Sequence, residues 1–222
     1  MTADVLDRYR RLDVCAVSDA IDALGHGGGA TGEIPRRWRA PRVCGRVQTM
    51  VVVDAPGARA DRHLGVNAIA RSSPGDVIMV QQRGELVAAC WGGLLARAAM
   101  ARGVAGVLID GACRDLDEIE DLRLPLFARA VVPHTARRRV IEDTCGEPIT
   151  FAGMSVAAGD IVIADGSGIA VVAQAAASEV LTVAEGVAAR EEAMTHALEG
   201  GEPLAAVLGA AYEEVLDEPI AR

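Results

Sequence analysis

The sequence predicts an α/β fold with helices at its C-terminal end, and three observations support this class. Two β-branched runs, 44–54 and 76–81, are bounded by glycine and proline and separated by a segment of helical pattern. A second strand, helix and strand follow, which is the pattern of a parallel crossover. From residue 175 onward the pattern is helical. We therefore expect a single domain over residues 1–222, with 175–222 as a helical C-terminal extension.

The N-terminal half begins with an amphipathic helix at residues 13–24. Its apolar residues recur at helical spacing, Asp13 is suited to the N-cap and Gly25 to the C-cap. The glycine-rich stretch 25–32 (GHGGGATG) predicts a loop, and 61–71 (DRHLGVNAIAR) predicts the helix between the first two strands.

The C-terminal half continues the alternation. We expect a strand at 85–90 (ELVAAC), a helix from Leu94 to Arg102 that ends at Gly103, and a strand at 105–109. Later elements are expected as short strands within 124–132 and 148–153, a hairpin at 159–172 around DGSG, a long helix at 177–199 and a second amphipathic helix at 203–216.

Composition excludes several function classes. All 22 basic residues are arginine, so Schiff-base aldolases, pyridoxal phosphate (PLP) enzymes and P-loop hydrolases, which need a lysine, are excluded. A net charge of -9 argues against nucleic acid as a partner, and the basic run 136–140 predicts a solvated loop. The sequence shows neither a signal peptide nor an apolar run that could cross a membrane, so we expect a cytoplasmic protein with no membrane partner.

The pair Arg114–Asp115 follows the predicted strand at 105–109 and carries the chemistry. Arginine can hold a carboxylate through two hydrogen bonds, and aspartate can hold a divalent cation that keeps most of its waters. Together they could bind a 2-oxo acid and stabilise the enolate formed when the bond β to its keto group breaks. An ordinary surface ion pair at the start of a helix is the competing interpretation.

The segments around this pair resemble the RraA-like family, which includes the 4-hydroxy-4-methyl-2-oxoglutarate and 4-carboxy-4-hydroxy-2-oxoadipate aldolases. The resemblance covers nearly the whole chain, and its most specific part is the central block GGLLARAAMARGVAGVLIDGACRD. The other matching segments are VSDAIDALG, SPGDVIMV, LPLFARAVVP, AAGDIVIADGSGIAVV and AREEAMTHALEGGE.

This resemblance implies a swivelling β/β/α sandwich that assembles as a homotrimer or homohexamer with active sites between subunits. It implies a class II lyase, a metal-dependent aldolase or decarboxylase that uses Mg²⁺ or Mn²⁺ and passes through a pyruvate enolate. By position, Arg114 would bind the pyruvyl carboxylate, Asp115 the metal, and the backbone of Gly92, Gly93, Leu94 and Leu95 the substrate. Glu191 of a neighbouring subunit, with Glu192 as the adjacent alternative, would complete the site.

One departure from the family concerns an acid that usually lies 21 residues before the matched arginine. Gly93 stands there in this chain. Glu118 or a partner's Glu191 could supply the missing charge. Restoring the acid by Gly93→Asp is expected to increase aldol cleavage. Two other functions remain open: a non-catalytic regulatory protein, and a lyase-type enzyme for a specialised metabolite whose bulk Gly93 accommodates.

Overall fold

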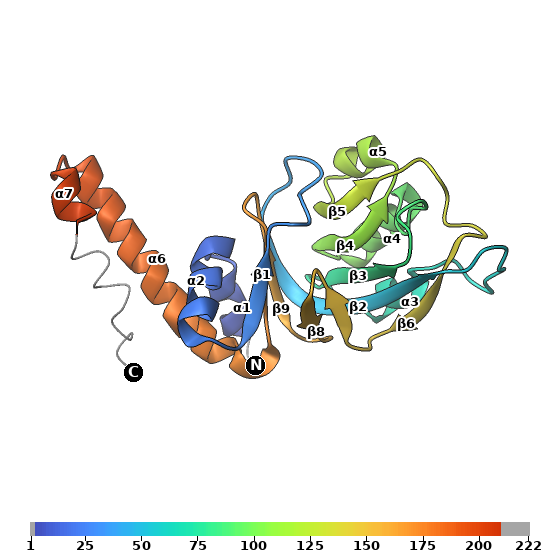
Figure 1. The fold of residues 1–222 in the computed structure, drawn as a ribbon, viewed down its shortest axis with the longest axis horizontal. Helices are drawn as coiled ribbons and strands as arrows, with labels where there is room; N and C mark the ends of the chain where they lie inside the picture. The colour runs from blue at the N-terminus through green and yellow to red at the C-terminus, as the bar shows by residue number, and fades with distance from the viewer. Residues whose placement is uncertain (1–2, 210–222) are drawn as a thin grey trace.

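The computed structural model describes residues 3–209, which form a mixed α/β fold around a large sheet (Figure 1). The strands are β1 (Gly28–Thr31), β2 (Val43–Asp54), β3 (Val77–Arg83), β4 (Gly106–Cys113), β5 (Leu126–Val131), β6 (Val140–Cys145), β7 (Ile149–Phe151), β8 (Met154–Val156), β9 (Ile161–Ala164) and β10 (Ile169–Val172). The helices are α1 (Ala3–Tyr9), α2 (Val14–Leu24), α3 (Val66–Arg71), α4 (Gly93–Arg102), α5 (Leu116–Asp121), the short 3₁₀ helix η1 (Gln174–Ala176), α6 (Ala177–Glu199) and α7 (Leu204–Val207).

The sheet has two halves that share the long strand β2. Its strand order is β1-β10-β9-β2-β3-β4-β5, and β6 also pairs with β2. Strands β2 to β5 are parallel, whereas β1, β10 and β9 form an antiparallel group. Residues 43–46 of β2 pair with β9 and residues 47–53 with β3, so one strand joins the crossover half to the hairpin half.

Each half has its own helical layer. On the parallel half, Trp91, Leu95 and Ile119 from the α4 and α5 region pack against Val107 and Ile109 of β4. On the antiparallel half, α1, α2 and the first turns of α6 cover β9 and β10. The rest of α6 extends away from the sheet, on the side opposite α4 and α5 (Figure 1). None of the helices in residues 3–209 has the length and apolar character needed to cross a membrane.

Several predicted elements are confirmed with their end signals. Helix α2 has Asp13 as N-cap, whose side chain accepts from the Ala16 N–H, and left-handed Gly25 as C-cap. Helix α4 ends at left-handed Gly103, as expected. The 159–172 hairpin forms as β9 and β10, with the Asp165 N–H donating to the Gly168 carbonyl. The predicted α/β class with a long C-terminal helix is therefore correct.

Other predictions were wrong in part, because long-range pairing overrode local pattern. Residues 85–90 form no strand; Cys90 N–H instead donates to the Ala112 carbonyl, and Ala88 receives the Gln82 amide. The glycine-rich stretch contributes the edge strand β1, because Gly28 lets β10 approach so closely that a Cβ there would lie 2.0 Å from the Val171 oxygen.

The remaining differences concern element boundaries. The helix expected at 61–71 is confined to α3, and the strand expected at 105–109 continues to Cys113. The last residue of the basic run 136–140, Val140, is the first residue of β6. Of the helix expected at 203–216, the structure has α7, and residues 210–216 lie outside the described residues.

The cysteines differ sharply in burial, which predicts their reactivity. Cys15 is exposed, whereas Cys44, Cys90 and Cys113 are buried. Burial raises the pKa of Cys44 to about 12 and that of Cys113 to about 11. At pH 8 only about one Cys113 thiol in a thousand would be ionised, so it should react very slowly.

We therefore expect the native protein to show one fast thiol, Cys15, in an Ellman titration at pH 8, with the half-buried Cys145 reacting more slowly and the three buried thiols appearing only after unfolding. The fast reaction should disappear in Cys15→Ser. Fast labelling of native Cys113, read by peptide mass spectrometry, would contradict the burial described above. Because Cys113 directly precedes Arg114, such labelling would also indicate opening of the chain beside that residue.

Candidate active site

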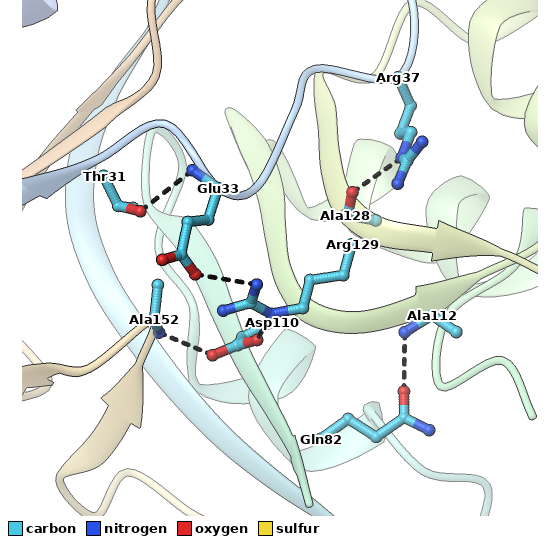
Figure 2. Close-up of polar contacts among 9 residues, drawn as sticks. All are labelled: Thr31, Glu33, Arg37, Gln82, Asp110, Ala112, Ala128, Arg129 and Ala152. Atoms are coloured by element: carbon cyan, nitrogen blue, oxygen red, sulfur yellow. Dashed lines mark hydrogen bonds and ion pairs between the residues drawn. The ribbon is translucent and has the colours of Figure 1, made fainter. Parts of the chain in front are cut away.

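The candidate site is built where β4 ends, and an irregularity in β4 shapes that end. The pairing of β4 with β5 shifts register between Ile109 and Ala112. Gln82 of β3 is buried and stabilises the shift: its Oε1 accepts from the Ala112 N–H at 2.8 Å (Figure 2). Its Nε2 donates to the Ala88 carbonyl at 2.9 Å. One side chain therefore connects the end of β4 to the segment that leads to α4.

Asp110 of β4 ties the same part of the strand to β5 and to the turn between β7 and β8. Its carboxylate accepts from Arg129 Nε and from the Ala152 N–H, and Arg129 also pairs with Glu33 at 3.0 Å (Figure 2). The hydrogen bond that Arg129 donates to Asp110 is the main cause that raises the pKa of Arg129. These side chains are absent from the lining of the pocket described below, so we interpret them as a scaffold for β4.

Two backbone contacts bring the predicted site segments together. Trp91 forms an isolated parallel bridge with Cys113, and the Arg114 N–H donates to the Trp91 carbonyl at 3.0 Å. The start of α4 therefore lies beside the end of β4, although Gly93 and Arg114 are 21 residues apart. Strand continuation past the register shift is what places Arg114 and Asp115 there.

Arg114 and Asp115 form a close pair directed at the start of α4. Arg114 Nε lies 3.3 Å from Asp115 Oδ2, and the Gly93 N–H donates to the same oxygen at 3.0 Å. The backbone of Asp115 is in the left-handed region (φ +58°), which is uncommon for residues other than glycine. A Cβ on Gly92 would lie 2.7 Å from Asp115 Oδ2, so the glycine there permits the approach.

The pair opens onto a pocket of about 250 Å³. The pocket is lined by His63, Leu64, Ala89, Cys90, Trp91, Gly92, Leu94, Leu95, Arg97, Arg114, Asp115, Glu118, Thr135 and Ala136. Two arginines and two carboxylates thus face one space. Because α4 begins at Gly93, the N–H groups of Leu94 and Leu95 have no preceding helical turn to bond, and an anion near them would be stabilised.

Most of the predicted site residues meet at this pocket. Gly92, Leu94, Leu95, Arg114 and Asp115 line it, whereas Gly93 does not; the Gly93 N–H donates to Asp115. Glu191 and Glu192 also lie outside the lining, exposed on α6 beyond Ala184, the last buried residue of that helix. Within one chain, the structure does not bring them to the pocket.

The space beside Gly93 is filled by Glu118. A Cβ at position 93 would lie 2.0 Å from Glu118 Oε2 and 2.4 Å from its Cδ. Arg97 Nε donates to Glu118 Oε1 at 2.6 Å and holds the carboxylate there. The expectation that Gly93 leaves room for a bulkier substrate stays a prediction, and in this arrangement it would require Glu118 to move. Likewise, an aspartate at position 93 could be accommodated only if Glu118 moved.

The donors around the pocket suit a cation that takes few protein ligands. In residues 3–209 no group of three or more His, Cys, Asp or Glu side chains is placed to hold a metal ion. Asp115 and Glu118 are the carboxylates that line the pocket, and both known contacts of Asp115 use Oδ2. Mg²⁺ commonly takes only one or two protein carboxylates and completes its shell with water and substrate, so these residues fit such an ion.

Sequence reasoning missed Arg97, His63 and Thr135 as pocket residues. Arg97 lies four positions after Gly93 on α4, so helical spacing alone places it on the same face as the start of the helix. His63 and Thr135 come from segments far away in the chain, and no local pattern marks them. Trp91, also in the wall, is 1% exposed, and its indole N–H has no partner among the described residues.

Comparisons with known proteins identify the family and the fold. The family model RraA-like, described as Aldolase/RraA, matches residues 14–171. A relative from Halalkalibacterium halodurans, named "Putative 4-hydroxy-4-methyl-2-oxoglutarate aldolase", is 28% identical over 195 residues, which are 88% of this chain and 89% of the relative.

Solved structures show the same fold. A protein from Pseudomonas syringae pv. tomato, described as uncharacterized, superimposes with a TM-score of 0.83 at 30% identity, covering 93% of this chain and 98% of that one. Streptomyces coelicolor RraAS2, described as an unusual member of the RNase ES inhibitor RraA protein family, superimposes with a TM-score of 0.77. At 23% identity, over 86% of this chain and 96% of that one, the second match supports the fold alone.

Proposed function

Since the chain belongs to the RraA-like family, we propose that it is a divalent-metal-dependent lyase acting on a small 2-oxo dicarboxylic acid. The reaction would be retro-aldol cleavage or decarboxylation of a β-keto acid, with pyruvate as a product. The observation that carries this proposal is the placement of Arg114 and Asp115 together in the wall of one pocket, beside the start of α4.

Arg114 is assigned to the carboxylate next to the keto group. Its guanidinium is always charged and can form two parallel hydrogen bonds to a carboxylate. The side chain is 38% exposed and lines the pocket, so its remaining N–H groups can reach a ligand. The N–H groups of Leu94 and Leu95 would add donors at the N-terminus of α4.

Asp115 is assigned to Mg²⁺ or Mn²⁺. Bound there, the ion would supply positive charge to offset the negative charge that develops on the keto oxygen. The Gly93 N–H and Arg114 both contact Asp115 Oδ2, which orients the carboxylate before any ligand arrives. The backbone of Asp115 is in the uncommon left-handed conformation, and these two contacts help to hold the residue in it.

The proposal is tested with purified protein and two substrates, oxaloacetate and 4-hydroxy-4-methyl-2-oxoglutarate. Pyruvate release is followed with lactate dehydrogenase, with added Mg²⁺ or Mn²⁺ and with EDTA. Release that requires the metal for either substrate supports a lyase. Absence of release from both substrates under all conditions would contradict it.

If neither substrate releases pyruvate, the non-catalytic regulatory function becomes the better candidate. The observation that favours it is Gly93, where family aldolases usually carry an acid. The retained Arg114–Asp115 pair in a pocket favours the lyase.

We also propose that the active form is a homo-oligomer, a trimer or hexamer, in which Glu191 of one copy enters the pocket of another. Glu191 is exposed on the C-terminal half of α6 and absent from its own chain's pocket. A role in the chemistry would therefore require a neighbouring copy.

A complementation experiment checks this assignment. Glu191→Gln and Arg114→Ala should each have low activity, yet a mixture dissociated and reassembled together should recover up to about one quarter of wild-type activity, because random pairing rebuilds that share of sites. The same mixture made with Glu192→Gln decides between the adjacent glutamates. Failure of the Glu191 mixture to exceed either variant alone, with an oligomer verified by light scattering, would contradict a shared site.

A further inference from the structure

Glu118 is the charged pocket carboxylate to which the proposed function gives no task. It lies on α5, and its carboxylate reaches across to α4. Its two oxygens have different surroundings. Oε1 accepts from Arg97, whereas Oε2 lies at the position that a side chain on residue 93 would occupy.

Glycine at position 93 is what makes this placement possible. The three atoms nearest to a Cβ there all belong to the Glu118 carboxyl group, at 2.0, 2.4 and 2.9 Å. Contacts below 3.0 Å do not occur for real Cβ atoms, so even alanine at 93 would displace the carboxylate. The backbone of Gly93 is not left-handed, hence the glycine is not explained by a backbone requirement.

Two carboxylates that line the pocket therefore converge on one backbone residue, Gly93. Asp115 Oδ2 lies 3.0 Å from the Gly93 nitrogen, and Glu118 Oε2 lies against the Cα side of the same residue. Each is matched by an arginine: Arg114 at 3.3 Å from Asp115, and Arg97 at 2.6 Å from Glu118. Arg97 thus offsets the cost of keeping a second negative charge near the first.

We propose that Glu118 is the proton acceptor for the substrate hydroxyl in retro-aldol cleavage, an inference that rests on the lyase function proposed above. The hydroxyl proton passes to Glu118 Oε2 directly or through one water, the carbon–carbon bond beside the hydroxyl breaks, and its electron pair stays on the pyruvyl fragment as the enolate. The carbon that bore the hydroxyl leaves as a carbonyl. Glu118 then returns the proton to the enolate carbon, which gives pyruvate.

The proposal separates the two candidate reactions. Retro-aldol cleavage must remove a hydroxyl proton, whereas decarboxylation of oxaloacetate releases carbon dioxide without that step. Loss of Glu118 should therefore affect one substrate much more than the other. An ion pair that only joins α4 to α5 would affect both substrates equally, through stability.

The test compares Glu118→Gln with Glu120→Gln, an exposed control on the same helix that does not line the pocket. For Glu118→Gln, kcat for cleavage of 4-hydroxy-4-methyl-2-oxoglutarate should fall by at least about 100-fold with KM little changed, as expected for loss of a general base. Decarboxylation of oxaloacetate should fall by no more than about threefold by the same reasoning. Mn²⁺ affinity, measured by calorimetry without substrate, should stay within about threefold of wild type, because Asp115 is the metal residue.

Position 93 supplies an independent variant. Gly93→Ala leaves Glu118 in the chain and only displaces it, yet should reproduce the selective loss of retro-aldol cleavage. Gly93→Asp combined with Glu118→Ala puts a carboxylate back into the same space and should recover part of the cleavage.

Several outcomes would overturn the inference. Equal losses on both substrates, or no loss, would show that Glu118 is not the proton acceptor. Wild-type protein that decarboxylates oxaloacetate but never cleaves the hydroxy acid would overturn it while leaving the lyase function in place. Absence of turnover of either substrate would overturn both proposals.

Discussion

Arg114→Ala should abolish most turnover of 2-oxo acids, lowering kcat/KM by about 100- to 1000-fold, the range found when a charged or oxyanion-binding donor is removed. The reason is that Arg114 is the pocket cation with free N–H groups next to Asp115, whereas Arg97 is engaged by Glu118. The measurement is kcat/KM for pyruvate release from the better of the two substrates.

Arg114→Lys is the matched variant for this prediction. Lysine keeps the charge but cannot form two parallel hydrogen bonds to a carboxylate, so activity should fall between wild type and alanine. Neither variant should unfold the protein, because the backbone N–H of residue 114 still donates to the Trp91 carbonyl. Wild-type kcat/KM in Arg114→Ala would remove this residue from the binding of substrate.

Asp115→Asn should lose divalent-cation affinity by about 100-fold or more, with a parallel loss of turnover at low metal concentration. Asparagine is the informative change because it tolerates the left-handed conformation (φ +58°) and keeps an oxygen for the Gly93 N–H. The charge is therefore removed while the local geometry is retained.

Mn²⁺ titration by calorimetry or electron paramagnetic resonance measures this effect directly, independently of catalysis. Asp115→Ala provides the contrast. It removes the charge and also the acceptor for Gly93 at the start of α4, so it should additionally lower the unfolding midpoint, whereas Asp115→Asn should leave it almost unchanged. Unchanged Mn²⁺ affinity in Asp115→Asn would place the metal elsewhere or exclude it.

Local signals predicted the elements whose ends are set by nearby residues. Asp13 and Gly25 delimit α2, Gly103 ends α4, and two uninterrupted apolar runs joined by a tight turn define β9 and β10. These features depend on contacts between residues a few positions apart, which a single sequence displays.

Prediction failed where a distant segment supplied the partner. Residues 85–90 have strand composition, but single hydrogen bonds to Gln82 and β4 hold them in an irregular path. The glycine-rich segment became β1 because β10 offers an edge and only glycine fits against Val171. Pairing of this kind is decided by the whole sheet rather than by the segment itself.

For the candidate site, the sequence by itself determined the residue types: the adjacent Arg114 and Asp115, the glycines before α4, and the exclusion of lysine chemistry. Only the tertiary structure decided what fills the space at Gly93. Glu118 reaches it because α4 and α5 pack side by side on the same sheet, with Arg97 holding the carboxylate in place. The side chains of Arg97 and Glu118, 21 residues apart, meet through helix packing, and packing is a property of the folded chain that spacing along the sequence does not contain.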